Sequence, residues 1–388
     1  MKNYDWIVVG AGITGAALAY ELAKQGLQVL LLEKEKNSHN ATDYSYGGVA
    51  YWSGSTPLTR QLCQESKHIL SNLSQELNGE TQYRELNLVL TIPHGHDPDT
   101  VRKNYENCLN PPDYLSVEEA IELEPLLNPN AIAGVLTVAH GHIHAQKTTR
   151  AYLQAFLRLG GTLEIEPVLN LLRQNEQITG VITSKNTYES RNTVICAGAF
   201  SRSFLEANNI RIPLYFSHTQ VIKTPPLNIH LRSLVMPAIL QRLKIEAEVR
   251  QPEKESDWTH PNSNVMAEII EPGAIQFLDG SYYLGQASQI ITDPSIIPDL
   301  TQREAEIRSQ IAKILPQLAN MPGTCHHCLV AFSDPSRPLV GKIQNLGGIH
   351  LFSGFTSPLA YAPPLARHFA TWATQGKDPI IDQFSPIA

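Results

Sequence analysis

The chain has 388 residues, of which 42% are hydrophobic and 17% charged, and its formal net charge is -7. These values are ordinary for a globular protein and exclude the highly charged, core-poor composition of a disordered one. No long run of lysine or arginine is present, so the sequence favours a small molecule over nucleic acid or an anionic lipid surface as its partner. The length predicts roughly two domains.

The N-terminal residues and the cysteines indicate the cellular compartment of the protein. The first ten residues, MKNYDWIVVG, contain an acidic residue and no cleavage site, and no apolar run approaches membrane-spanning length. An odd number of cysteines in a chain of this size argues against a secreted disulfide framework; they are Cys63, Cys108, Cys196, Cys325 and Cys328. We therefore expect a cytoplasmic protein with free thiols.

The chain begins with a predicted strand, helix and second strand. Residues 5–10 form an apolar strand, the next segment has apolar residues at helical spacing up to Gly26, and LQVLLLEKE reads as a buried parallel strand. A βαβ unit of about thirty residues is typical of a dinucleotide-binding fold.

The predicted elements continue in chain order. A helix over 56–80 precedes a strand at YRELNLVLTIPHG, and Ser116 is the expected N-cap of another helix. A helix over 148–160 precedes four strands, the last of them, TYESRNTVICAG, of buried parallel type. Proline and polar clusters predict an irregular segment over 225–265. A hairpin turning on two residues, Asp279 and Gly280, is followed by a helix over 301–319 and a last strand and helix in GGIHLFSG and PPLARHFATWATQG.

A glycine motif stands between the first strand and helix. Gly10, Gly12 and Gly15 form GxGxxG: the first permits a tight turn, the second admits a pyrophosphate and the third packs the helix on the strand. Glu33 closes the next strand, where a carboxylate accepts hydrogen bonds from ribose hydroxyls. The pyrophosphate would lie at the helix N-terminus, where the macrodipole stabilises negative charge.

The motif alone does not separate NAD from FAD. Its position at the start of the chain, with a late strand ending in VICAGAFS, resembles the layout of flavoproteins. The small residues Ala197 and Gly198 let that backbone pass close to a cofactor. The expected cofactor is therefore FAD.

Several segments together resemble the D-amino-acid oxidase superfamily, in its glycine oxidase and sarcosine oxidase branch: VVGAGITGAALAYELAKQG, TDYSYGG, HGHIHAQKTTRAYLQAFLRLGG, TVICAGAFS, DGSYYLGQ, RPLVG and LFSGFTSPLAYAPPLA. The resemblance implies an α/β fold with a discontinuous Rossmann-type FAD-binding domain over 1–85, 145–212 and 325–388. An α+β substrate domain, built on a mostly antiparallel sheet, would take up 86–144 and 213–324.

The resemblance also implies which residues contact the flavin. The glycine motif would bind the pyrophosphate, Glu33 the ribose, Val168 the adenine, and the loop before the last helix the pyrimidine edge of the ring. The full expected set is Gly10, Gly12, Ile13, Thr14, Gly15, Glu33, Lys34, Thr42, Ser45, Tyr46, Gly47, Gly48, Val168, Ala197, Gly198, Cys328, Gly354, Phe355, Thr356, Ser357, Pro358 and Leu359.

The sequence departs from this family at the substrate carboxylate. Relatives hold that group with an arginine, and Val330 stands at the matching position, while Ser217 and His218 stand where many relatives have Arg-Gly. A bidentate arginine is the natural partner of a carboxylate, so glycine is in doubt as the substrate. Arg60 or Arg337 could supply a charge from another direction, although surface ion pairs are the ordinary role of such residues.

Aromatic residues gather in the segments expected near the ring: Tyr44, Tyr46, Tyr51, Trp52, Phe355 and Tyr361. Such residues are equally common in ordinary cores. As substrate contacts we predict Tyr46, Trp52 and Phe355, which would suit an amine bulkier or less acidic than glycine.

Cys328 lies on or beside the position at which the sarcosine oxidase branch links FAD covalently, so it is a candidate for that bond; a buried structural thiol is the alternative. Its CxxC pairing with Cys325 also matches half of a zinc site or a redox disulfide. His140, His142 and His144 alternate along one strand face. A second ligand pair is missing, so no metal site is predicted.

The resemblance implies oxidation of an amine or amino-acid-like C–N bond by hydride transfer to flavin N5, with oxygen or another acceptor reoxidising the flavin. The protein mainly positions the substrate and excludes water, so no acid or base is required. His218 is the candidate for contacting the substrate amine. Two alternatives stay open: a 2-hydroxy acid dehydrogenase and a non-catalytic flavin-binding subunit.

Overall fold

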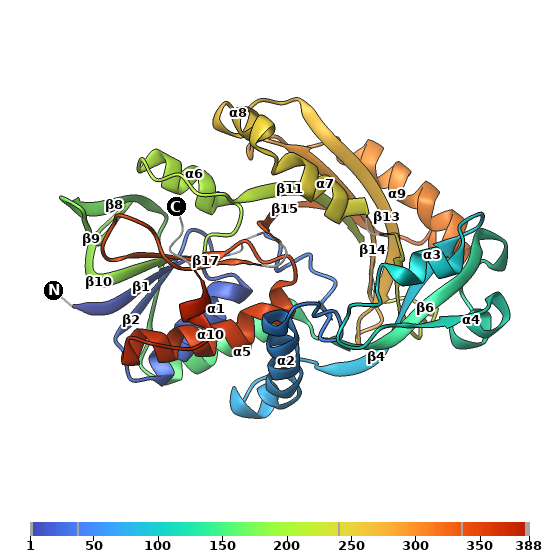
Figure 1. The fold of residues 1–388 in the computed structure, drawn as a ribbon, viewed down its shortest axis with the longest axis horizontal. Coiled ribbons are helices and arrows are strands. Elements are labelled where there is room, and N and C mark those ends of the chain that lie inside the picture. Colours follow the sequence, from blue (N-terminus) through green and yellow to red (C-terminus); the bar gives the residue numbers. More distant parts are fainter. Residues whose placement is uncertain (1–2, 37–38, 240, 335–336, 385–388) are drawn as a thin grey trace.

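The structure is a computed structural model that describes residues 3–36, 39–239, 241–334 and 337–384. Two sheets stand side by side, each with its own helices (Figure 1). Helices α1, α5 and α10 lie with the first sheet, and α9 packs on the second. In the described part of the chain, no helix is long and apolar enough to cross a membrane.

The first sheet has a parallel core. Its order is β16-β17-β10-β1-β2-β7, with β8 and β9 as an antiparallel extension of β10. Every neighbouring pair from β17 to β7 is parallel. The bounds are β1 Tyr4–Val9, β2 Val29–Glu33, β7 Thr162–Ile165, β8 Val168–Gln174, β9 Gln177–Thr183, β10 Thr187–Ile195, β16 Leu339–Lys342 and β17 Ile349–Ser353. This confirms the Rossmann-type unit predicted from the sequence.

The second sheet is mostly antiparallel, also as predicted. Its order is β15-β11-β14-β13-β12-β4-β6-β3, and β5 pairs with β6. Only the β12–β4 pair runs parallel among its described strands. The bounds are β3 Gly48–Val49, β4 Arg84–Pro93, β5 Asp113–Leu115, β6 Ile132–His142, β11 Tyr215–Lys223, β12 Leu234–Pro237, β13 Val265–Gln276, β14 Tyr282–Ile291 and β15 Thr324–Phe332.

The α-helices surround the two sheets (Figure 1). Capping residues fix several starts: Ser116 caps α4 in a capping box with Glu119, as expected for a serine followed by a glutamate three residues later. The bounds are α1 Ile13–Lys24, α2 Pro57–Glu76, α3 Pro98–Lys103, α4 Val117–Leu123, α5 Ala145–Arg158, α6 Phe200–Ala207, α7 Gln241–Val249, α8 Glu255–Thr259, α9 Leu300–Ile314 and α10 Pro358–Gln375.

The two faces of the second sheet have different neighbours. Ile222, Ala287 and Cys325 pack with α9 residues such as Ile307, and this side is named the back face. The front face is the opposite side, where Val221 belongs to the same apolar cluster as residues of α1 and α10. Because side chains alternate along a strand, the pairing register assigns most residues to one face.

Two local predictions were wrong. Residues 225–265 are not irregular: β12 lies inside the second sheet, and α7 and α8 follow it. Four residues are too few to show an alternating pattern, and β12 is held by its partners β4 and β13. The hairpin loop has three residues, because the Phe277 N–H donates to the Ser281 carbonyl at 2.8 Å and Gly280 takes a φ of 85°.

The sheets do not follow the predicted domain boundaries at every point. β15 begins at Thr324 and pairs with β11 in the second sheet, whereas the predicted FAD-binding segment begins at 325. β3 also pairs with β6 in the second sheet. The domain division itself stays a prediction.

A half-buried histidine ties α10 to its neighbours. His368 places Nε2 2.9 Å from Glu65 Oε2 and Nδ1 2.9 Å from Asp378 Oδ2. Burial lowers the pKa of this ring, but the hydrogen bonds to Glu65 and Asp378 outweigh it, so the net shift is upward. Both ring nitrogens lie against carboxylate oxygens, an arrangement that favours the protonated ring as donor from both.

We predict that His368→Gln lowers the free energy of unfolding by about 1 kcal/mol under mildly acidic conditions. A raised folded-state pKa gives stability that is present below the unfolded-state pKa and lost as the pH rises through the folded-state pKa. The difference between wild type and variant should therefore shrink at alkaline pH. Urea unfolding at both pH values measures it; an equal difference at both would contradict the protonated assignment.

Candidate functional site

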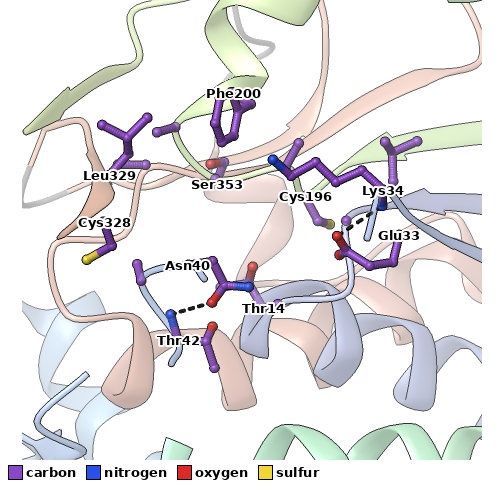
Figure 2. A pocket seen from close by; sticks show the side chains of 18 of the residues that line it. Thr14, Glu33, Lys34, Asn40, Thr42, Cys196, Phe200, Cys328, Leu329 and Ser353 are labelled. Atoms are coloured by element: carbon purple, nitrogen blue, oxygen red, sulfur yellow. Dashed lines mark hydrogen bonds between the residues drawn. The ribbon is translucent and has the colours of Figure 1, made fainter. Parts of the chain in front are cut away.

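A cavity of about 790 Å³ lies where the two sheets meet. Its volume is in the range of cofactor and small-molecule sites, roughly 300–1,000 Å³. The wall includes Glu33 at the end of β2, the start of α1, Cys328 on β15 and Leu359 in α10. Figure 2 shows Glu33 and Lys34 at one side of this space and Cys328 and Leu329 at the other.

The three motif glycines have different surroundings. Gly10 has a φ of 104°, and a Cβ there would lie 2.6 Å from the Cys196 carbonyl oxygen. A Cβ on Gly15 would lie 1.9 Å from the Gly10 carbonyl oxygen, so this glycine lets α1 approach the strand ends. Gly12 has an ordinary φ of -63°, lines the cavity and would carry a Cβ without a clash. Of the three glycines, only Gly12 would carry a Cβ without a clash against backbone, and it does so at the cavity wall.

Two side chains hold the turn around α1. Glu33 Oε2 accepts a hydrogen bond from the Ala11 N–H at 2.8 Å, which places this carboxylate directly over the glycine turn. Thr42 Oγ1 accepts from the Ile13 N–H at 3.1 Å, in the first turn of α1. Asn40 Oδ1 in turn accepts from the Thr42 N–H at 2.8 Å (Figure 2). A helix N-terminus, a carboxylate and a polar loop therefore meet at one end of the cavity.

The structure brings most of the predicted cofactor residues together. Those that line the cavity are Gly10, Gly12, Ile13, Thr14, Glu33, Lys34, Thr42, Ser45, Val168, Ala197, Gly198, Cys328, Gly354, Phe355, Pro358 and Leu359. Those outside its wall are Gly15, Tyr46, Gly47, Gly48, Thr356 and Ser357. Residues of the second set are close in sequence to residues that line the wall. Gly15 lets α1 pack closely on the strand ends.

Some lining residues were not predicted. Phe200, 42% exposed at the start of α6, has the Lys34 ammonium 4.4 Å from its ring centre. Both residues line the cavity and are labelled in Figure 2. An aromatic residue after the VICAGA strand was the available signal, because it begins a helix at the carboxyl end of a parallel strand.

Comparison with known proteins decides the family. The family described as FAD dependent oxidoreductase matches residues 5–372. The chain belongs to this family. It is therefore an FAD-dependent oxidoreductase, and a Rossmann-type unit with a glycine turn and a terminal carboxylate is the arrangement that such a cofactor requires.

Individual relatives agree with this assignment. An uncharacterized oxidoreductase, YurR, of Bacillus subtilis is 26% identical over 57% of this chain and 62% of its own length. Glycine oxidase of Pseudomonas aeruginosa is 25% identical over 97% of this chain and 96% of its own. The solved glycine oxidase of Geobacillus kaustophilus shares the fold, with a TM-score of 0.78 at 17% identity over 98% of this chain and 96% of that one. The first four curated relatives are matched over only 27 to 62% of their own length.

Cys328 of the oxidoreductase lines the cavity, whereas Cys325 packs on the back face with α9. The two CxxC thiols lie on opposite sides of β15 and are not placed to share a metal or form a disulfide. Burial, and then Asp43, raises the pKa of the Cys328 thiol to about 12. The covalent link to FAD stays a prediction, which retention of yellow colour in acid-precipitated protein would show.

His218, the candidate for amine contact, is fully buried and outside the cavity wall. Its Nε2 donates to the Ile291 carbonyl at 3.1 Å, so its Nδ1 accepts from His327 Nε2 at 3.0 Å. It pairs in register with Gln289, which reaches Arg303 of α9 through Glu268, and therefore faces the back of the sheet. Of this pair His327 lines the cavity and His218 does not, and amine contact by His218 stays a prediction.

The sequence predicted that no arginine would stand at the position of Val330 to hold a substrate carboxylate. Val330 lines the wall, and Lys34 is the only lysine or arginine among the described lining residues. Arg337 is exposed, and the exposed Arg60 donates to the Asn107 carbonyl at 2.9 Å. Neither offers its charge to the cavity.

Of the predicted substrate residues, Phe355 lines the cavity and the other two lie behind it. The Trp52 Nε1–H donates to His140 Nδ1 at 2.9 Å. The Tyr46 hydroxyl donates to the Gly273 carbonyl at 3.4 Å. Burial lowers the pKa values of His140 and His142 to about 3, so both rings are neutral. Trp52 and His140 form a buried, uncharged support on the front face.

Proposed function

We propose that this FAD-dependent oxidoreductase oxidises the C–N bond of an amine. The observation that carries the proposal is one cavity, lined at one end by the glycine turn near the start of the chain and at the other by the N-terminus of α10 near its end. A flavin dinucleotide needs both ends: one for its phosphates and one for its ring. Glycine oxidase, matched over nearly its whole length, supports an amine as the substrate.

Each end of the cavity suits one part of the cofactor. The N-terminus of α1 would hold the pyrophosphate, and Glu33 would exchange its bond with the Ala11 N–H for ribose hydroxyls. Gly354, with a φ of 74°, turns the chain into α10, whose N-terminus would stabilise negative charge on the pyrimidine edge. When bound, the flavin accepts a hydride from the carbon next to a neutral amine nitrogen.

The wall composition favours a substrate bulkier or less acidic than glycine. Val330 and Phe355 line the cavity where a small carboxylate would need a cation. Apolar walls exclude water from the reacting atoms and leave the protein to position the substrate. No acid or base is assigned, because hydride transfer from a neutral amine requires none.

We predict that an amine bleaches the flavin of the purified holoprotein under anaerobic conditions, and that sarcosine or a larger N-alkyl amine does so at least about tenfold faster than glycine, a barrier difference of roughly 1.4 kcal/mol. Stopped-flow absorbance over a panel of amines and 2-hydroxy acids measures this. Reduction by hydroxy acids alone would assign the dehydrogenase alternative, and no reduction by either class would assign the non-catalytic one. Parallel runs with oxygen and with a dye identify the electron acceptor.

A further inference from the structure

Glu271 on β13 is a buried carboxylate with no cationic partner. It is 5% exposed, and its oxygens accept hydrogen bonds from the Arg242 backbone N–H at 3.3 Å and from Gln286 Nε2 at 3.2 Å. Within the described part of the chain, no lysine, arginine or histidine forms an ion pair with it. Burying a carboxylate without a cationic partner is costly, and a cationic ligand would remove that cost.

The register places Glu271 on the front face. Ile270 pairs with Ala287, which packs with α9 on the back face, so the next side chain points the other way. The register shifts between Ile270 and Gly273, and β11 shifts against β14 at the same level. Gly273 and Gly285 face each other there and contribute no side chains. The Tyr46 hydroxyl lies against this irregularity, 3.4 Å from the Gly273 carbonyl oxygen.

Tyr46 connects Glu271 with the flavin cavity. Its hydroxyl reaches the Gly273 carbonyl, and a Cβ built on Gly285 would lie 3.7 Å from that hydroxyl oxygen. Burial, and then the charge of Glu271, raises the pKa of Tyr46, which agrees with the two groups being neighbours. Ser45, the residue before Tyr46, lines the cavity.

A second carboxylate makes the surroundings of Glu271 more negative. Glu246 on α7 is 2% exposed, and its Oε2 has no hydrogen-bond partner among the residues described. Arg242 lies 3.4 Å from Glu246 and offsets that one charge. Arg242 is thus engaged by Glu246, and Glu271 forms no ion pair within the described residues.

We infer that Glu271 binds a second, cationic ammonium group of the substrate, which is a diamine without a carboxylate whose other, neutral nitrogen adjoins the carbon that is oxidised. The inference rests on the proposed amine oxidation and names its substrate class. An ammonium would donate hydrogen bonds to the free lone pairs of Glu271 and supply the missing counter-charge. It also accounts for Val330, since a substrate without a carboxylate needs no arginine at the wall.

The test uses a pair of unreactive probes of one shape. The carbon next to nitrogen in tert-butylammonium bears no hydrogen, so it cannot be oxidised, and pivalate has the same shape with a negative charge. Titration of the oxidised holoprotein should perturb the flavin spectrum with tert-butylammonium and not with pivalate. Glu271→Gln, which keeps the shape and removes the charge, should raise the Kd of tert-butylammonium at least tenfold.

Glu268→Gln is the matched control. Glu268 lies on the same strand on the back face, paired with Arg303 of α9, so its loss should leave the Kd unchanged. Thermal unfolding of both variants checks their folding, and Glu271→Asp, which keeps the charge, should retain binding if Glu271→Gln unfolds. Preference for pivalate, or an unchanged Kd in folded Glu271→Gln, would overturn the inference.

The outcomes separate this inference from the proposed function. Flavin reduction by amino acids with no effect of Glu271→Gln would leave amine oxidation standing and remove the cationic substrate. Binding of tert-butylammonium that depends on Glu271, with no reduction by any amine, would remove the oxidation and keep the cation site.

Discussion

Gly12→Val is expected to give a folded protein that has lost FAD. The φ of -63° at Gly12 is available to any residue, and a Cβ there makes only an ordinary contact, 3.4 Å from Thr42 Oγ1. The change should therefore cost the fold no more than about 1 kcal/mol. A branched side chain at the start of α1 would occupy the space of the pyrophosphate, and affinity should fall at least about 100-fold.

The matched comparison is Gly15→Ala, in which a smaller side chain has the larger structural effect. Its Cβ would lie 1.9 Å from the Gly10 carbonyl oxygen, so α1 must move away from the strand ends. We expect Gly15→Ala to lower the unfolding midpoint and Gly12→Val to leave it near that of the apoprotein. Fluorescence titration with FAD and circular dichroism measure the two effects. A yellow Gly12→Val protein would contradict the placement of the pyrophosphate.

Arg367→Met is expected to have the largest effect on stability. Arg367 on α10 pairs with Glu21 of α1, at 3.1 Å, and with Glu76 of α2. Glu21 is 4% exposed, so the variant leaves a buried carboxylate with only Lys24, at 3.8 Å, as a partner. Breaking a buried pair on one side typically costs 3–5 kcal/mol; because Arg367 is one-third exposed, we expect about 3 kcal/mol.

The pH dependence of the stability loss in Arg367→Met tests whether the unpaired charge of Glu21 causes it. Burial raises the pKa of Glu21 although Arg367 and Lys24 lower it. Protonation of Glu21 removes the unpaired charge, so the deficit of Arg367→Met should shrink as the pH falls. Glu21→Gln in the same chain should recover part of the loss. Urea unfolding of the two variants measures this, and a deficit that neither acid nor the second substitution reduces would point to lost packing instead.

The sequence predicted the geometry of the glycine turn and Glu33 well because it is local. Gly10, Gly12 and Glu33 lie within one βαβ unit, and their spacing alone brings the turn, the helix end and the carboxylate together. Val330 was also located correctly as a wall position. The positions of these residues follow from the order of strands and helices along the chain.

The substrate end could not be predicted in the same way because it depends on pairing between distant strands. His218 and Thr219 are neighbours in sequence, yet one faces α9 and the other pairs with Cys328 of the cavity wall. Alternation separates their faces but does not say which face meets the cofactor. Glu271 faces forward by alternation from Ile270, but the register shift that follows it places Gly273 and Gly285 opposite each other, and no sequence pattern marks such a shift.

The central claim is that one cavity holds FAD and presents it to an amine. The most direct test is the visible spectrum of the purified protein before and after anaerobic addition of the amine panel. We predict a bound-flavin spectrum that an amine bleaches and that Gly12→Val lacks. A protein that stays colourless and takes up no FAD would contradict the account of the cavity, and a bound flavin that no amine reduces would contradict its proposed use.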